Sequence, residues 1–331
     1  MLVLNAADVA RALPMREAIA AMKRAFAALS GGQAIVPRRI HLPIERHAGV
    51  SLIMPSYVAG DEATADSLAV KVVSLFDGNR RRGLPRIQAA VILLEPETGR
   101  PVALLEGATL TAIRTAAASG AATDLLARRD SRVVALFGAG VQAARHAEAM
   151  CAVREIAEVR VCGRRPERLS AFCAALTGGL GGNVRVVEAA SPADALRGAD
   201  IVCTATTSSE AVFADADLPS GAHVNAVGSY QPQAREIPGE TVARALVVVD
   251  SRAPAWEEAA DLILPLEAGQ INRQHVHAEL GELVLGQKSG RIDDAQITLF
   301  KSVGIAVQDA VAAQAAFAAA QRLNLGTRVA W

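Results

Sequence analysis

The 331-residue sequence predicts an α/β protein with a doubly wound parallel sheet and a second, α+β domain. Three observations lead to this prediction. From Ser131 onward, short apolar runs typical of buried strands alternate with helical segments, which is the pattern of βαβ units. Before that point, several strand-like runs follow one another without helices, as in an antiparallel or mixed sheet. A glycine-rich turn at residues 138–140 separates the first apolar run of the alternating part from its helix.

In the first part of the chain, residues 5–30 carry apolar side chains at helical spacing and predict a helix that ends at Gly31-Gly32. Turns that contain Gly, Asp or Pro separate the runs that follow. A long helix is expected from Thr109. The strand-like runs between these helices begin at Val36, Ser51, Ser67 and Ile87.

In the second part, we expect six strands of a parallel sheet and a closing helix over Thr298–Arg322 that packs on the first domain. The predicted domains are residues 1–115 with 300–331, and residues 116–299. The six strand-like runs begin at Arg132, Val159, Val184, Ile201, His223 and Ala245.

The composition limits the function classes. The chain has 34 Lys and Arg against 34 Asp and Glu, so its formal net charge is zero and gives no argument for a nucleic-acid or membrane partner. We find neither a secretion signal nor an apolar run of the ~20 residues that span a bilayer, and expect a cytoplasmic protein. The four cysteines lack C-x-x-C spacing and the pair His275 and His277 lacks an evident third ligand, so no metal is expected.

The glycine turn matches the dinucleotide-binding pattern G-x-G-x-x-A of a Rossmann-type domain. Gly138 permits the tight turn, Gly140 lets a pyrophosphate approach the backbone, and Ala143 keeps the helix close to the sheet. Val141 and Gln142 belong to the same loop and are counted among the predicted cofactor-binding residues. The alternative is a purely structural turn.

The end of the second strand of this domain indicates which dinucleotide is preferred. An acid there would bind the ribose 2′-OH of NAD, but the sequence has Arg164, Arg165 and Arg168 instead. Guanidinium groups bind a 2′-phosphate well, so NADPH is favoured over NADH. The alternative is that these arginines form the solvated start of a helix.

Eight short segments along nearly the whole chain form a recognisable set. They are PRR (37–39), MP (54–55), VKV (70–72), LTAIRTA (110–116), GAGVQA (138–143), HVNAVG (223–228), AELGE (278–282) and FKSVG (300–304). In this order they resemble the ornithine cyclodeaminase/μ-crystallin family. The resemblance implies a Rossmann domain, a substrate-binding and dimerisation domain, a homodimer, and a small imino or amino acid as substrate.

Basic residues inside apolar runs are costly to bury unless they meet an anion. Lys71 lies in the middle of a predicted strand, Arg114 in an apolar helix, and Arg39 in a strand expected to border them. The resemblance assigns the substrate carboxylate to these three residues, and gives Arg114 and Thr115 a possible contact with the cofactor phosphates. Structural salt bridges are the alternative for each cation.

Further candidates are weaker. Thr204 and Thr206 end a strand at the carboxyl edge of the sheet, where ligands collect. Glu258 could hydrogen-bond an imine nitrogen or be a solvated glutamate, and Tyr230 could donate a proton or line the pocket. Among residues of the resembling segments, Val227 and Ser302 are assigned to the cofactor.

Departures from the family pattern favour one chemistry. In the cyclodeaminases an Asp and a Lys follow the HVNAVG segment, where this chain has Tyr230 and Ala234, and the Glu expected before Met54 is missing. A cyclodeaminase needs a base for the substrate ammonium. The G-S-Y-x-P pattern at residues 228–232 instead resembles the ketimine and Δ1-pyrroline-2-carboxylate reductases of the family. This resemblance, together with the arginines after the second strand, implies an NADPH-dependent reductase of small cyclic imino acids such as Δ1-pyrroline-2-carboxylate or Δ1-piperideine-2-carboxylate. Alternatives are an ornithine cyclodeaminase, an alanine dehydrogenase, or a μ-crystallin-like protein that binds NADPH without significant turnover.

Overall fold

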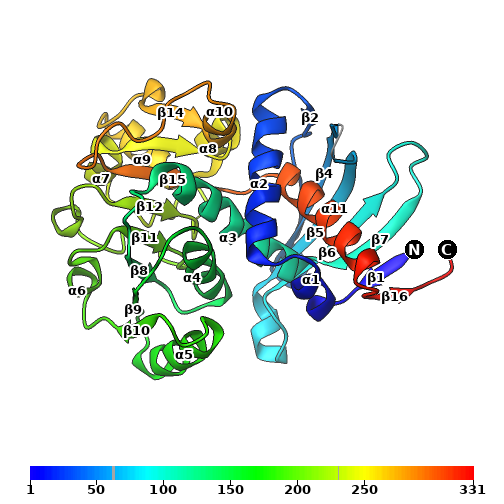
Figure 1. Cartoon of the computed structure of the whole chain (residues 1–331), viewed down its shortest axis with the longest axis horizontal. Helices are drawn as coiled ribbons and strands as arrows, with labels where there is room; N and C mark the ends of the chain where they lie inside the picture. Colours follow the sequence, from blue (N-terminus) through cyan, green and yellow to red (C-terminus); the bar gives the residue numbers. More distant parts are fainter. Residues whose placement is uncertain (62–63, 230) are drawn as a thin grey trace. The chain divides into compact units, whose positions relative to one another are not determined.

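The computed structural model describes residues 1–61, 64–229 and 231–331. It divides into two compact units (Figure 1). The first unit contains residues 1–114 and 305–331, and the second contains residues 115–304. The division falls inside helix α3 (Gly107–Leu126), which is the long helix expected from Thr109.

The first unit contains a mixed sheet in the order β16-β1-β7-β6-β5-β4-β2, with β3 also paired to β4. Neighbouring strands are antiparallel except β1 and β7, which are parallel. The expected mixed sheet is therefore confirmed. Its strands are β1 (Leu2–Leu4), β2 (Ala34–Ile35), β3 (Ile40–Ile44), β4 (Gly49–Val58), β5 (Ser67–Phe76), β6 (Ile87–Leu94), β7 (Pro101–Glu106) and β16 (Thr327–Arg328).

Helix α11 (Ala306–Arg322) packs on β4, β5 and β6 of this sheet and on α2 (Met15–Ser30) (Figure 1). The predicted helix over residues 5–30 is in fact two helices, α1 (Ala6–Ala12) and α2, because Pro14 caps α2 and cannot continue α1. Alternate residues of each strand face α11, so Leu52, Met54 and Val73 are buried there.

The second unit contains an all-parallel sheet in the order β10-β9-β8-β11-β12-β15-β13-β14. The strand order reverses between β8 and β11, where doubly wound sheets bind ligands. The six predicted strands are present. The strands are β8 (Val133–Phe137), β9 (Glu158–Cys162), β10 (Arg185–Glu188), β11 (Ile201–Thr204), β12 (His223–Ala226), β13 (Leu246–Val249), β14 (Val276–Glu279) and β15 (Thr298–Lys301).

Strand β15 corrects one prediction. We expected a helix from Thr298, but Thr298–Lys301 is a buried strand between β12 and β13, and α11 begins only at Ala306. Between them, Gly304 takes a positive φ of 80°, which a continuous helix does not allow.

Helices cover both faces of the parallel sheet, as predicted. On one face the amide of Asn225 in β12 donates to Thr123 in α3, and on the other face Val224 packs in an apolar cluster with Leu196 and Leu262. No helix of the described residues is long and apolar enough to cross a membrane. The helices of this unit after α3 are α4 (Val141–Val153), α5 (Pro166–Gly179), α6 (Pro192–Leu196), α7 (Gly239–Arg244), α8 (Arg252–Glu258), α9 (Ala260–Glu267) and α10 (Leu280–Val284).

Candidate active site

The glycine loop lies at the reversal point of the parallel sheet, between β8 and α4. Gly138 has a φ of 115°, and a Cβ atom there would lie 2.5 Å from the carbonyl oxygen of Ala205. Only glycine therefore fits at this position. Gly140 caps α4 and has open space where a Cβ atom would stand, so the N-terminus of α4 is accessible to an anion.

The rest of the loop combines a buried and an exposed residue. Ala143 is completely buried and Val141 is 72% exposed, so α4 is held close to the sheet while its first turn faces outward. Gln142 is half-buried, and its carbonyl oxygen lies 2.7 Å from Nδ1 of His146. Burial lowers the pKa of His146 to about 4, so the neutral ring donates to this carbonyl and Nε2 accepts from Ser119 at 3.0 Å. This contact fixes the first turn of α4 against α3.

The three arginines after β9 are all exposed. Arg164 and Arg165 precede α5, and Arg168 lies in its first turn. None of them has an ion-pair partner among the residues that the structure describes. Their guanidinium groups can therefore take a phosphate without breaking an ion pair within the described residues.

The threonines of the β11 edge have structural partners. Thr204 is completely buried and its hydroxyl donates to Glu236 at 2.9 Å. The backbone N–H of Thr206 donates to the same carboxylate at 2.7 Å. The half-buried Val227 donates its N–H to the carbonyl of Thr204. Sequence reasoning missed Glu236, which organises this edge.

Ser302 also contacts an acid that sequence reasoning missed. Its hydroxyl donates to the buried carboxylate of Asp250 at 2.8 Å, and the N–H groups of Val303 and Gly304 donate to the same oxygen at 2.9 and 2.7 Å. Asp250 follows β13 directly, at the carboxyl edge of the sheet. A strand-ending acid was the available signal for this residue.

In the first unit, the structure brings Lys71 and Arg114 together on one carboxylate. Lys71 Nζ lies 2.5 Å from Oδ2 of Asp309, and Arg114 Nε lies 3.1 Å from Oδ1. Arg114 also donates from Nη1 to Gln308 Oε1 at 2.7 Å. Asp309 and Gln308 belong to the first turn of α11, and sequence reasoning missed both. The alternative of a structural salt bridge is thus real, but it accounts for only one of two positive charges.

The charge balance of this cluster favours an anion. The pKa of Lys71 is lowered to about 8, mainly by burial; the positive charges of Arg114 and Arg39 contribute to this fall, and Asp309 opposes it. Arg39 therefore belongs to the same electrostatic environment. The expectation that it lies in a strand was wrong: residues 36–39 form no strand between β2 and β3, where Pro37 has no N–H to donate. We call Arg39, Lys71, Arg114 and Asp309 the cation cluster.

The remaining predicted residues are less informative. Thr115 follows Arg114 in α3 and is half-buried, and Glu258 is half-buried at the end of α8. Tyr230 lies outside the described residues, so the structure gives no view of its side chain.

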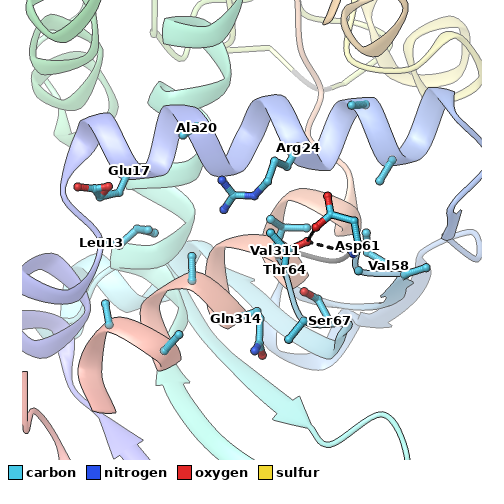
Figure 2. A pocket seen from close by; sticks show the side chains of 18 of the residues that line it. Leu13, Glu17, Ala20, Arg24, Val58, Asp61, Thr64, Ser67, Val311 and Gln314 are labelled. Atoms are coloured by element: carbon cyan, nitrogen blue, oxygen red, sulfur yellow. Dashed lines mark hydrogen bonds between the residues drawn. The ribbon is translucent and has the colours of Figure 1, made fainter. Parts of the chain in front are cut away.

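A separate hollow of about 490 Å³ lies in the first unit, with α2 along one side and α11 along another (Figure 2). Glu17 and Arg24 of α2 and Val311 and Gln314 of α11 line it. None of the predicted site residues is among its described lining residues. We therefore do not place the active site in this hollow.

Comparisons with known proteins find matches over nearly the whole chain. The model of the ornithine cyclodeaminase/mu-crystallin family matches residues 1–322. The chain is 39% identical over 330 residues to a Delta(1)-pyrroline-2-carboxylate reductase of Bacillus cereus, and the match covers 99% of both chains.

Two solved structures have the same fold over essentially the whole chain. One is the Thermococcus litoralis Delta(1)-pyrroline-2-carboxylate reductase in complex with NADH and L-proline (TM-score 0.93, 41% identity, 99% of this chain and 100% of that chain). The other is an archaeal alanine dehydrogenase dimer with bound NAD (TM-score 0.91, 31% identity, 100% and 99%). With the family model matching from Met1 to residue 322, this chain belongs to the ornithine cyclodeaminase/mu-crystallin family.

Proposed function

We propose that the protein is an NADPH-dependent reductase of small cyclic imino acids, which converts Δ1-pyrroline-2-carboxylate to L-proline, Δ1-piperideine-2-carboxylate to L-pipecolate, or both. The general reaction class, an oxidoreductase that uses a nicotinamide dinucleotide on a C=N bond, is supported by the pyrroline-2-carboxylate reductases described above. The observation that carries the proposed imino-acid substrate is the cation cluster, because it offers an excess of buried positive charge to a carboxylate.

In this mechanism, Lys71 and Arg114 bind the substrate carboxylate, and Asp309 holds both cations in place through its two oxygens. A bound reduced nicotinamide would supply a hydride to the imine carbon. The imine nitrogen carries a proton beforehand, because an iminium attracts hydride, and it keeps that proton in the cyclic amine product. Fixing the carboxylate orients the imine carbon, and such positioning can remove roughly 7–11 kcal/mol of barrier. A contact of Glu258 with the imine nitrogen and a place for Tyr230 in the wall of the pocket are part of the proposal.

For the cofactor, we propose that the glycine loop and the N-terminus of α4 hold the pyrophosphate. Residues Arg164, Arg165 and Arg168 would hold the 2′-phosphate of NADPH, because all three are exposed and no acid stands among the residues between β9 and Pro166. Thr115, Val227 and Ser302 remain proposed cofactor contacts.

We also propose a homodimer. The face of the first unit's sheet that α11 does not cover carries exposed apolar side chains, among them Ile40 (57%), Leu42 (52%), Val72 (37%) and Ile92 (36%). Strand register places Ile40 beside Ile53, and Val70 beside Ile92, on this face. Burying apolar surface is favourable by about 25 cal/mol per Å². A second copy of the same face would bury these side chains in a two-fold dimer.

The test is a cofactor-by-substrate matrix. NADH and NADPH are each combined with the five-membered imine, the six-membered imine, pyruvate plus ammonia, and ornithine. The proposal expects oxidation of NADPH with one or both cyclic imines. Turnover only with pyruvate plus ammonia would indicate an alanine dehydrogenase, turnover only with ornithine a cyclodeaminase, and tight NADPH binding without turnover a binding protein. Each of these three results contradicts the proposal.

A further inference from the structure

One buried carboxylate joins the two loops that follow strands β11 and β12. Glu236 is completely buried. It accepts hydrogen bonds from the N–H of Thr206 at 2.7 Å, the N–H of Gly228 at 2.7 Å and the hydroxyl of Thr204 at 2.9 Å. Thr206 lies just after β11 and Gly228 just after β12, so a single side chain sets the separation of the two loops.

The residues around this carboxylate are too closely packed to accept an added Cβ atom at Gly228. A Cβ atom on Gly228 would lie 2.4 Å from Oε1 and 2.5 Å from Oε2 of Glu236, and 2.5 Å from the carbonyl oxygen of Thr206. Gly228 is therefore needed for the close approach of the two loops. This explains the glycine of the HVNAVG segment, for which the sequence alone offers no reason.

A second layer holds Glu236 itself. Asp261 at the start of α9 accepts the backbone N–H groups of Glu236 and Ile237 at 2.7 and 2.9 Å. Its other oxygen lies 2.7 Å from Nζ of Lys301 in β15, which also donates to the carbonyl of Ser229 at 2.6 Å. Asp261 and Lys301 are both completely buried. The network thus contacts described residues near both ends of the segment between β12 and α7.

This network contains two acids and one base, all without solvent contact. Burial raises the pKa of Glu236, and Lys301 opposes that shift. All three partners of Glu236 donate, so the arrangement suits the ionised form, which only accepts. Apolar packing in place of buried charges is often neutral or stabilising, so a charged network at this edge calls for a role beyond stability.

We propose that Glu236 is a positioning residue that sets the two loops so that the nicotinamide end of the dinucleotide is oriented for hydride transfer. Ligands of doubly wound sheets bind outside the carboxyl ends of the strands, and the half that begins at β11 serves the second mononucleotide. The inference rests on the proposed reductase function. A purely structural role would predict a loss of stability and nothing else.

The test compares Glu236→Gln with the unmutated protein in three measurements. Steady-state kinetics use NADPH that is undeuterated or deuterated at nicotinamide C4, binding of 2′-phospho-ADP-ribose is titrated, and urea unfolding is followed. We expect kcat to fall roughly 10- to 100-fold, as for a misplacement of about 1 Å. The deuterium isotope effect on kcat should rise because hydride transfer becomes slower. Affinity for 2′-phospho-ADP-ribose, which lacks nicotinamide, should stay unchanged.

Asp200→Asn is the matched control. Asp200 also accepts two backbone N–H groups, from Arg132 and Val133 at 2.8 and 2.9 Å, but it lies at the opposite, amino end of β11. This variant should lose stability while keeping the isotope effect. Glu236→Asp is the second variant, since it keeps the charge but cannot reach both loops. It should change the isotope effect in the same direction, and it serves if the Gln variant fails to fold.

An unchanged isotope effect in the folded Glu236 variants, with kcat reduced no more than in Asp200→Asn, would overturn the inference. If the unmutated protein reduces no imine, the proposed function fails separately. The inference is then tested by the fluorescence of bound NADPH. This fluorescence should differ between the Glu236 variants and the unmutated protein, and it should be the same in Asp200→Asn and the unmutated protein. Equal fluorescence in all of them would overturn it.

Discussion

Replacing Asp309 by Asn tests whether this acid tunes the cation cluster. In the unmutated protein the pKa of Lys71 is about 8, so at pH 7 its charged form outnumbers the neutral form roughly tenfold. Asp309 is the group that raises this pKa, whereas burial, Arg114 and Arg39 lower it. Without the carboxylate the pKa should fall further, and Lys71 should be largely neutral at pH 7.

The change in stability can be bounded from the same values. A fall in pKa from the ordinary 10.5 to about 8 corresponds to about 3 kcal/mol, and full deprotonation of Lys71 at pH 7 would correspond to about 5 kcal/mol. Lys71 can therefore add only about 1–2 kcal/mol to the destabilisation, because it loses its proton rather than remaining charged without a partner. Arg114 cannot, and a weakened charge-assisted hydrogen bond costs about 1.5–3 kcal/mol. We expect a loss of about 3 kcal/mol in the free energy of unfolding, measured by urea denaturation.

Catalysis should report the charge more directly. With a neutral Lys71, kcat/KM for the imino acid at pH 7 should fall roughly 10- to 100-fold. The defect should shrink as pH is lowered, because Lys71 regains its proton. The assay measures kcat/KM between pH 5.5 and 9, with Asp66→Asn as the control. Asp66 belongs to the same unit, but its carboxylate accepts hydrogen bonds from Tyr57 and Gly60, neither of which belongs to the cation cluster. If Asp309→Asn matches this control in kcat/KM and in pH dependence, the reasoning is wrong.

The site and the sheet lead to four further predictions. In the unmutated protein, KM for the imino acid should rise as pH increases through about 8, because Lys71 loses its charge. A KM that does not change up to pH 9.5 would contradict this. The free energy of unfolding should increase between about pH 8 and pH 10.5, because in that range only the unfolded chain keeps the proton of Lys71. Arg164→Ala should weaken NADPH binding roughly tenfold or more and NADH binding little, by fluorescence titration, and equal losses for both cofactors would exclude a 2′-phosphate contact. Val72→Lys, on the uncovered sheet face, should shift the mass in light scattering from dimer to monomer, whereas an intact dimer would place the interface elsewhere. Tyr230→Phe should leave kcat and its pH profile nearly unchanged, because a preformed iminium needs no donor; a loss of 10²-fold or more would identify a general acid.

The sequence predicted the features that depend on local pattern. The βαβ alternation identified six strands, and the glycine loop falls at the reversal of the sheet order. Strand β14 was missed because its sequence, VHAE, lacks the continuous apolar run by which the other strands of this sheet were recognised, and β15 was missed because its residues were assigned to the start of the closing helix. The break at Pro14 could have been predicted, since proline rarely continues a helix.

The cations of the candidate site could be predicted, but their acidic partners could not. Lys71 and Arg114 stand out because charge interrupts an apolar run, whereas Asp309 sits in the first turn of a helix, where acids are common. Its contact with Arg114 spans 195 residues of sequence. Glu236 and Asp250 lie outside helices and strands, and their role depends on backbone N–H groups that only the fold brings to them.

The alternation of β5 places the proposed carboxylate-binding residue and the proposed dimer face in a single register. Lys71 points to the side that α11 covers, and the next residue, Val72, points to the open face. A one-residue insertion or deletion ahead of them would exchange the two, placing a valine beside Asp309 and an ammonium group on the apolar surface. Insertions or deletions in this strand are therefore expected to be tolerated only two residues at a time, because that keeps each side chain on its own face. Single substitutions on the open face are expected to alter self-association and to leave the proposed carboxylate contact of Lys71 unchanged.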